Sequence, residues 1–337
     1  MTEPPVARPS SRAGGERAAV PMTCLRENSC AFISRGGAVG KLLTLTLACH
    51  LSRRLQSGPR GAYTVARTVG LTSVFELDFH VQRLAKSASL MLEGDGAAAP
   101  AGSELEACCD AARLHTRIVD AWGECVRAMG PSGAKELKLS ALLSWDVATG
   151  AAELRAHAAP LPSRPPHPVR AIVRGAPRSN AEAKDSAWIA ARAGLDAVGK
   201  AAGANEVVLV DGNGDLLEGL SSNFYAVEAD GALVTAEEGV LKGTVRDVAL
   251  RACEREGVPV RLRPPRLADA RSWKGCLVSS TSRLALPVDE LVYEVAASGE
   301  EVTVKFDYSS ETGDDTALKV EALVLGDMAA NSQPVIE

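Results

Sequence analysis

The sequence predicts a two-domain protein of the α+β or α/β class, for three reasons. Its 337 residues, 46% of them hydrophobic, provide enough material for two domains or one large one. Residues 160–168 (PLPSRPPHP) carry five prolines, which exclude a helix or a central strand and predict a semi-rigid connector. Helical and strand-like patterns are mixed before this connector, whereas short strands joined by tight turns prevail after it. We therefore expect a first domain over residues 56–159 and a second over residues 169–337.

The first domain is expected to combine a sheet with helices. Residues 63–69 and 137–145 are apolar, β-prone runs that predict strands. Residues 79–92 and 103–129 carry apolar side chains at helical spacing and predict helices.

The second domain is expected to be richer in sheet. Its turn signals at residues 211–214 (DGNG) and 229–231 lie between closely spaced apolar runs, and strands joined so tightly pair antiparallel. This part is therefore expected to be a meander and not half of a dinucleotide-binding fold. The expected helices cover residues 186–202 and 244–256, with Gly257 as a cap, and the expected strands cover residues 206–210, 223–227, 232–236, 258–263 and 276–280.

Composition and charge exclude several classes of function. The net charge of −5 and the absence of long charged blocks argue against binding to nucleic acid or an anionic membrane, and favour a small-molecule substrate. The longest apolar stretch near the start, residues 42–51, is too short to span a bilayer. Eight cysteines without disulfide-like spacing predict reduced thiols and an intracellular location, and five scattered histidines predict no metal site.

Residues 1–55 are expected to form a disordered or poorly defined extension. The first 36 residues are rich in Pro, Ser, Gly and Arg without hydrophobic periodicity. Arg and Ser are also favoured in organelle transit peptides, but Glu3, Glu16 and Glu27 argue against one. A cytoplasmic location is therefore expected, and a plastid or mitochondrial location stays open as the alternative.

Several familiar sequence motifs are incomplete or absent. Residues 36–41 (GGAVGK) approach a phosphate loop, but Leu42 stands where a Ser or Thr must reach magnesium. Gly212, Gly214 and Gly219 lack the dinucleotide-binding spacing, and no Gly-x-Ser-x-Gly elbow supports a hydrolase.

Four segments after the connector form one constellation. They are AKDSAW at residues 183–188, EVVLVD at 206–211, EGLSSNF at 218–224 and LKGTVR at 241–246. In this order they resemble the cofactor-binding half of the class IV aminotransferases, which include branched-chain and D-amino acid aminotransferases and aminodeoxychorismate lyases. The resemblance extends from about residue 61 to about residue 291 through RTV at 67–69, HVQRL at 80–84 and SSTSR at 279–283. The version of the motifs found here is most similar to plant and algal members.

The resemblance implies a fold and a cofactor. The implied fold is the D-amino acid aminotransferase-like fold type IV, with a small α/β first domain and a larger, sheet-rich pseudobarrel as second domain. The implied cofactor is pyridoxal 5′-phosphate (PLP), bound between the two domains. The family also implies a homodimer.

Lys184 and Glu218 are the implied centre of the chemistry. A PLP enzyme needs a lysine that becomes an uncharged nucleophile, forms a Schiff base with the cofactor aldehyde and carries a proton between Cα and C4′. A carboxylate beside the ring nitrogen favours the pyridinium form, which makes the ring a better electron sink. The resemblance assigns the first role to Lys184 and the second to Glu218.

The resemblance also implies how the phosphate and the substrate are held. A guanidinium group and the amides at a helix start suit a phosphate, and Gly243 precedes the helix expected from residue 244. The implied phosphate ligands are Arg83, the amides of Thr244 and Val245, and Thr281. The implied substrate-binding residues are Arg67, Ser282 and Arg283.

The sequence departs from the family pattern near the substrate. Many relatives have a tyrosine five residues after the lysine that contacts the cofactor O3′, and here that position is Ile189. The strand expected over residues 137–145 lacks a Tyr-x-Arg or Arg-x-His pair, and only Lys138 offers a charge there. The glycine-rich opening of the first domain is missing before Tyr63.

We therefore expect a PLP-dependent aminotransferase of amino acid metabolism that moves an amino group between an amino acid and a 2-oxo acid. A PLP-dependent lyase of the aminodeoxychorismate lyase type uses the same lysine and stays open as an alternative. A non-catalytic protein that retains the fold is a second alternative. Substrate identity and stereochemistry are open.

Overall fold

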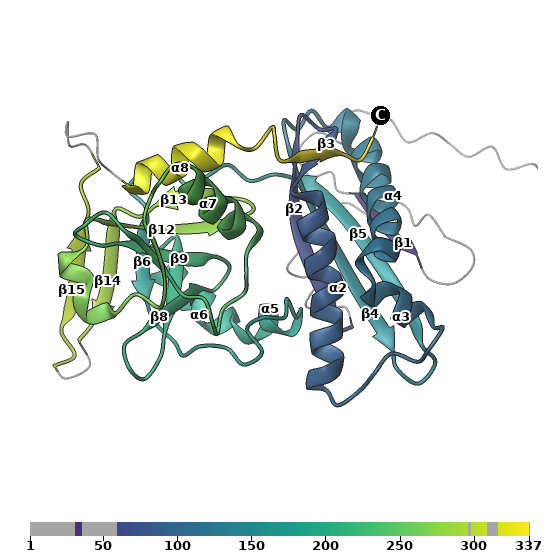
Figure 1. The fold of residues 1–337 in the computed structure, drawn as a ribbon, viewed down its shortest axis with the longest axis horizontal. Coiled ribbons are helices and arrows are strands. Elements are labelled where there is room, and N and C mark those ends of the chain that lie inside the picture. The colour runs from purple at the N-terminus through teal and green to yellow at the C-terminus, as the bar shows by residue number, and fades with distance from the viewer. Residues whose placement is uncertain (1–30, 36–58, 296–297, 309–315, 337) are drawn as a thin grey trace, which may run out of the picture.

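The computed structural model describes residues 31–35, 59–295, 298–308 and 316–336, which form two lobes side by side (Figure 1). The first lobe contains a six-stranded sheet and the second a ten-stranded sheet. The mixed α and β fold expected from the sequence is thereby confirmed. Within these ranges, no helix combines the length and the hydrophobicity that a membrane span requires.

The first lobe is an antiparallel sheet with helices packed on one face (Figure 1). Its elements are β1 (Ala31–Arg35), β2 (Ala62–Val69), β3 (Ser73–Phe75), α2 (Leu77–Gly94), α3 (Glu104–Cys109), α4 (Ala111–Met129), the short 3-10 helix η2 (Gly130–Ser132), β4 (Leu137–Asp146), β5 (Ala151–Pro160) and β16 (Ser332–Pro334). The strands lie in the order β1-β5-β4-β2-β3-β16. Leu84 and Met91 of α2 and Trp122 of α4 are buried against Leu139 and Leu154 of the sheet, because apolar residues at helical spacing give each helix one hydrophobic face.

Three features of this lobe differ from expectation. β1 lies within residues 1–55 and pairs with β5, so five residues of the expected extension form a strand. The helix expected over residues 103–129 is divided at Asp110, whose side chain caps α4 by accepting a hydrogen bond from Arg113 N. β16 returns from the end of the chain to pair with β3, although residues 169–337 were all assigned to the second domain.

The second lobe is a larger sheet with helices outside it. Its elements are β6 (Arg170–Val173), α5 (Ala187–Ala191), α6 (Ala193–Ala201), β7 (Glu206–Val210), β8 (Leu216–Gly219), β9 (Asn223–Val227), β10 (Leu233–Thr235), α7 (Thr244–Arg255), β11 (Val260–Leu262), the 3-10 helix η3 (Leu267–Ser272), β12 (Gly275–Ser280), β13 (Leu284–Pro287), β14 (Glu290–Glu294), β15 (Glu301–Lys305) and α8 (Thr316–Gly326). The antiparallel meander expected from the turn signals is confirmed for β7 to β10. Parallel pairs of β6 with β7 and β14, and of β10 with β11, were not expected.

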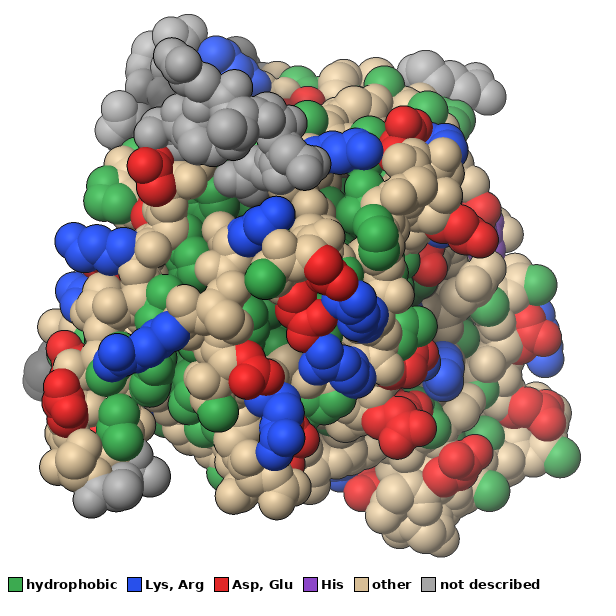
Figure 2. All heavy atoms as spheres, turned by 60° about the vertical axis from the view of Figure 1, so that its left-hand side comes forward, with side chains coloured by type: hydrophobic (Ala, Val, Ile, Leu, Met, Phe, Trp, Pro, Cys, Tyr) green, Lys and Arg blue, Asp and Glu red, His purple; other side chains and the backbone are tan. Residues whose placement is uncertain are grey.

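The surface of the molecule carries both signs of charge. On the face shown in Figure 2, basic and acidic side chains lie next to each other. Many charged side chains of the described residues form ion pairs, for example Arg261 with Asp230 and Arg263 with Glu228. Exposed pairs of this kind contribute little to stability, about 0–1 kcal/mol each.

The two lobes are joined by backbone pairing at the start of β2. Tyr63 N donates to the carbonyl oxygen of Lys184 (2.9 Å), and Ser186 N donates to the carbonyl oxygen of Gly61 (3.0 Å). Gly61 N in turn donates to Ser186 Oγ (3.0 Å). Residues 184–186 therefore pair with the start of β2, whose opposite edge is already paired with β4.

This close approach requires a glycine at position 61. A Cβ atom there would lie 2.2 Å from the carbonyl oxygen of Leu143 on β4, so Gly61→Ala forces β2 and β4 apart. We expect a loss of about 1–3 kcal/mol in the free energy of unfolding, measured in urea. Gly194→Ala in α6 is the control, because nothing lies within 4 Å of its added Cβ and the change should stabilise by up to about 1 kcal/mol. Equal stabilities for the two variants would contradict the packing argument.

Candidate active site

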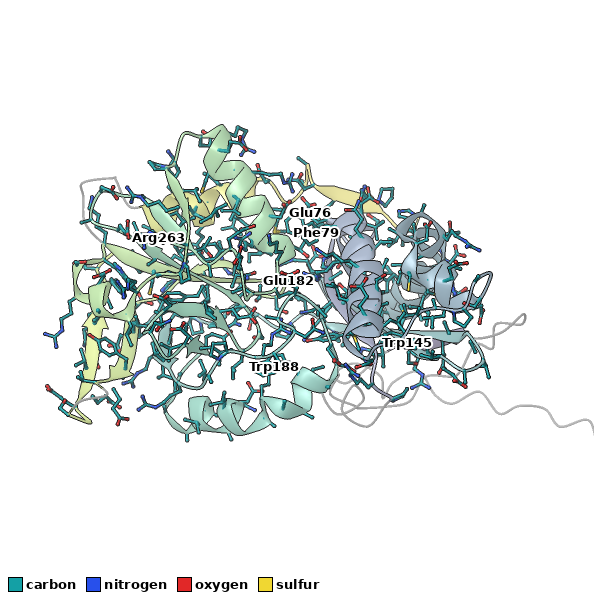
Figure 3. All side chains as sticks on the ribbon, turned by 60° about the horizontal axis from the view of Figure 1, so that its bottom comes forward. Glu76, Phe79, Trp145, Glu182, Trp188 and Arg263 are labelled. Carbon is teal, nitrogen blue, oxygen red and sulfur yellow. The ribbon has the colours of Figure 1, made fainter. Side chains whose placement is uncertain are left out.

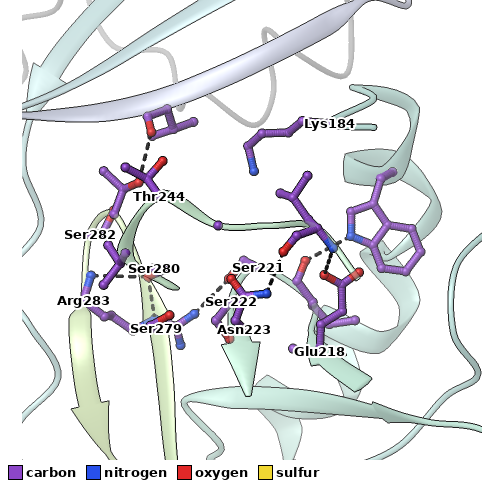
Figure 4. Close-up of a pocket in the computed structure, with 18 of the residues that line it drawn as sticks. Lys184, Glu218, Ser221, Ser222, Asn223, Thr244, Ser279, Ser280, Ser282 and Arg283 are labelled. Carbon is purple, nitrogen blue, oxygen red and sulfur yellow. Dashed lines mark hydrogen bonds between the residues drawn. The ribbon is translucent and has the colours of Figure 1, made fainter. Parts of the chain in front are cut away.

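A pocket of about 530 Å³ lies between the two lobes and takes side chains from both of them. It contains every site residue predicted from the sequence except Arg67. The predicted residues in its wall are Arg83, Lys184, Glu218, Thr244, Val245, Thr281, Ser282 and Arg283. Figure 4 shows the side chains of Lys184 and Glu218 directed toward the same space.

Lys184 places its amine in this pocket from the segment paired with β2. Its own N–H donates to Ser87 Oγ of α2 (3.1 Å), and its Nζ lies 4.7 Å from the centre of the Tyr63 ring. Within the described residues, Nζ has neither a hydrogen bond nor an ion pair. Burial lowers the pKa of Lys184 well below its usual value, and the charges of Arg83, Arg178 and Arg192 lower it further against the opposing effect of Glu218. This amine is therefore suited to act uncharged.

Glu218 is a buried carboxylate on β8 with a partner for each oxygen. Its Oε1 accepts a hydrogen bond from Nε of Arg178 (2.7 Å), and its Oε2 accepts one from Leu241 N (3.0 Å). Since a carboxylate oxygen has two acceptor positions, each can still accept another bond from a ligand. Arg178 was not predicted from the sequence.

Two residues in the wall of the pocket, Arg83 and Thr244, are suited to bind a phosphate. Arg83 is partly buried, donates to Thr64 Oγ1 (3.0 Å), and its buried Nε has no hydrogen-bond partner among the described residues. Burial lowers the pKa of Arg83 to about 10, which still leaves it charged at neutral pH. α7 begins at Thr244 without a side-chain cap, and Thr244 Oγ1 is also buried without a partner. Free amides at a helix start, a hydroxyl and a guanidinium group together fit a phosphate ester.

Thr281 and Arg283 already have protein partners. Thr281 Oγ1 donates to the carbonyl oxygen of Val65 (3.0 Å), which leaves its lone pairs available. Arg283 forms an ion pair with Glu206 and donates to Ser221 Oγ (2.9 Å). Its charge is therefore balanced within the protein.

Arg67 is buried on β2 but is not among the residues in the wall of the pocket. Its neighbour on the adjacent strand is Lys138 of β4, which does line the pocket. Burial lowers the pKa of Lys138, and the nearby charge of Arg192 lowers it further. In the described part of the chain, the Lys138 amine has no acidic partner.

Further pocket residues were not predicted from the sequence. Tyr63, Trp188 and Arg192 join Arg178 in the wall, and Trp188 lies where the two lobes meet (Figure 3). Arg192 follows α5 and donates to the carbonyl oxygen of Leu220. Two local features of the sequence pointed to this part of the site. They were the charge of Lys138 and the presence of Ile189 where many relatives have a tyrosine. The arginines became recognisable only once the lobes were assembled.

The ion pair of Glu206 and Arg283 makes the stability of the folded protein depend on pH. Burial by itself would raise the pKa of Glu206, but Arg283 and hydrogen bonds from Ser222 Oγ and Val207 N outweigh burial and lower it. Because the pKa in the folded state lies below that in the unfolded state, the stabilisation is present above the unfolded value. It is lost as the pH falls through the folded value.

We expect Glu206→Gln to reduce the free energy of unfolding by about 3–5 kcal/mol at pH 7, because Arg283, whose side chain is 12% exposed, loses its carboxylate partner. The difference from the unchanged protein should shrink as the pH falls below about 4.3, where free glutamate protonates. Urea unfolding across pH 3 to 7 measures this. Glu301→Gln on the exposed face of β15 is the control. A difference that persists unchanged at low pH would rule out the ion pair as its origin.

The comparisons with known proteins agree with this geometry. A family model described as amino-transferase class IV matches residues 61–291. Solved structures that share the fold include branched-chain aminotransferases, so the expected fold type IV is confirmed. The chain belongs to the class IV aminotransferase family.

Among curated proteins, a putative branched-chain-amino-acid aminotransferase of Methanocaldococcus jannaschii is 32% identical over 92 residues. That match covers 27% of this chain and 32% of the relative, so it spans about a third of the relative's length. Similar structures include the branched-chain aminotransferase of Thermoproteus uzoniensis with norvaline (TM-score 0.63, 21% identity, 91% of this chain and 99% of that one). A hypothetical aminotransferase of Mycobacterium tuberculosis in its PLP-bound form has a TM-score of 0.65 at 20% identity, over 89% of this chain and 99% of that one.

Proposed function

We propose that this protein is a PLP-dependent aminotransferase that moves an amino group between an amino acid and a 2-oxo acid. The observation that carries the proposal is the meeting of one amine and one carboxylate, Lys184 and Glu218, in a single pocket between the lobes. The surroundings of Lys184 favour its uncharged form.

The buried polar atoms without partners fit the cofactor. Arg83, Thr244 and the amides at the start of α7 would hold its phosphate, with Val245 and Thr281 beside them. Glu218 would accept a hydrogen bond from its ring nitrogen, and Lys184 would bind its aldehyde. When bound, PLP supplies a reactive aldehyde and a ring that accepts the electrons released at the substrate Cα.

Lys184 is proposed to carry the proton. With PLP bound, Lys184 Nζ would take the proton from the substrate Cα and later return it. A lysine with a lowered pKa suits both steps, because its free-base form accepts a proton at neutral pH.

Lys138 is proposed to bind a carboxylate of the substrate. It lines the pocket on the face of the first sheet that also carries Tyr63 and Val65, which form an apolar cluster with Ile189, and its amine has no acidic partner in the described residues. Such a cluster suits an aliphatic side chain, in keeping with the branched-chain aminotransferases among the similar proteins. Ser282 also lines the pocket and is a further candidate. Arg283 could bind the substrate only by giving up its ion pair with Glu206. Arg67 could bind it only if its side chain moved into the pocket.

The homodimer stays a prediction, as does the intracellular location. The lyase alternative also stays open, and the substrate assay below distinguishes it from amino transfer.

The amine of Lys184 should be the group that captures PLP. Incubation with PLP and then borohydride is expected to leave a reduced adduct on Lys184, identified by mass spectrometry. Lys184→Met should abolish this adduct and lower the transamination rate by about 10²–10⁴-fold or more. Lys200→Met, at an exposed position of α6, is the control and should change neither. An adduct that survives in Lys184→Met, or pyruvate release without an amino acceptor, would count against an aminotransferase with this lysine.

Lys138→Met should weaken substrate binding without removing the cofactor. Loss of a hydrogen bond to a charged group costs about 1.5–3 kcal/mol, so KM for amino acid and 2-oxo acid should rise about ten- to hundredfold. Steady-state kinetics measure KM, and PLP absorbance verifies that cofactor is still bound. Lys135→Met, exposed three residues earlier, is the matched control. An unchanged KM in Lys138→Met would remove Lys138 from the substrate site.

A further inference from the structure

Arg178 is a buried arginine that contacts both halves of the site. Its side chain is 7% exposed, and it stands in the segment between β6 and Lys184. Nε donates to Glu218 Oε1 (2.7 Å), Nη1 donates to the carbonyl oxygen of Ala183 (2.9 Å), and Nη2 donates to that of Ala181. The guanidinium group lies 5.7 Å from the centre of the Trp188 ring.

We propose that Arg178 is a positioning residue that fixes the amine of Lys184 and the carboxylate of Glu218 relative to each other. The inference rests on the proposed function, because it concerns the two residues assigned to opposite ends of the cofactor. Arg178 itself is not assigned to the reacting atoms.

The geometry supports this role because the two groups are held by different lobes. Lys184 is paired with β2 of the first lobe, whereas Glu218 belongs to β8 of the second. Arg178 bonds directly to the Glu218 carboxylate and to the carbonyl of Ala183, the residue before Lys184. A guanidinium group presents its donors in one rigid plane, so bonds in two directions fix a separation that a lysine could not fix.

The charges support the same role. Lys184 is surrounded by Arg83 of α2, Arg178, Arg192 after α5, Glu218 of β8 and the Tyr63 ring of β2. The three arginines lower the pKa of Lys184, whereas Glu218 raises it. Arg178 faces both groups, so its loss removes one of the three repulsions from the Lys184 ammonium and frees the Glu218 carboxylate from its ion pair, while Arg83 and Arg192 remain. Both changes favour the charged form of Lys184.

The experiment measures Lys184 in the cofactor-free protein. Acetic anhydride labels only uncharged amines, and mass spectrometry gives the extent of Lys184 labelling at each pH. Arg178→Met should move the midpoint of labelling upward by about one pH unit or more. Adding Glu218→Gln should return the midpoint toward that of the unchanged protein. Arg174→Met is the matched control, because Arg174 pairs with Glu294 and does not line the pocket.

Arg178→Lys separates positioning from charge. It retains the positive charge but loses the planar fork, so the labelling midpoint should stay near that of the unchanged protein. The Kd for PLP, measured by absorbance, should rise about tenfold or more. PLP binding as tight as in the unchanged protein would overturn the proposal, and so would a folded Arg178→Met protein with an unshifted midpoint. If Arg178→Met does not fold, the Kd of Arg178→Lys for PLP is sufficient to test the proposal. Failure of the unchanged protein to bind PLP would instead contradict the proposed function.

Discussion

The site depends on the backbone pairing of residues 184–186 with the start of β2. Through this pairing a lysine that follows the second lobe's first strand is attached to the sheet of the first lobe. The opposite edge of β2 is occupied by β4, and Gly61 lets the two strands approach closely. The Lys184 amine therefore enters the pocket from a rigid sheet, whereas Glu218 enters from the other lobe. A pocket with both groups exists only while the two lobes remain in contact.

The net charge of the pocket depends on which basic residues around this junction are paired with a carboxylate. Arg178 and Arg283 are balanced by Glu218 and Glu206 within the protein. Arg83 and Lys138 are partly buried without acidic partners among the described residues, and burial lowers the pKa of each. A site with uncompensated positive charge favours a ligand that brings its own negative charge. A phosphate at Arg83 and a carboxylate at Lys138 would supply it.

Local signals in the sequence were sufficient for part of the fold and the site. Apolar runs predicted β2 and β4, and Gly243 before a helical pattern predicted the open start of α7. The break at Asp110 was not predicted, because the apolar spacing continues across this N-cap residue and indicated a single helix. β1 and β16 were not predicted, because each is stabilised by pairing with a strand far away in the chain. A short strand of that kind has no strong pattern of its own.

The sequence by itself determined which chemical groups are present and in what order, since motifs around Lys184, Glu218 and Thr244 are local and carry the resemblance to the family. Only the tertiary structure decided which of the many arginines meet them. Arg178 pairs with Glu218 across 40 residues, and Arg283 with Glu206 across 77. Charge partners at such separations are set by the packing of two lobes. A Coulomb interaction depends on the distance between two charges in space. The local sequence around an arginine therefore does not show which carboxylate it will meet.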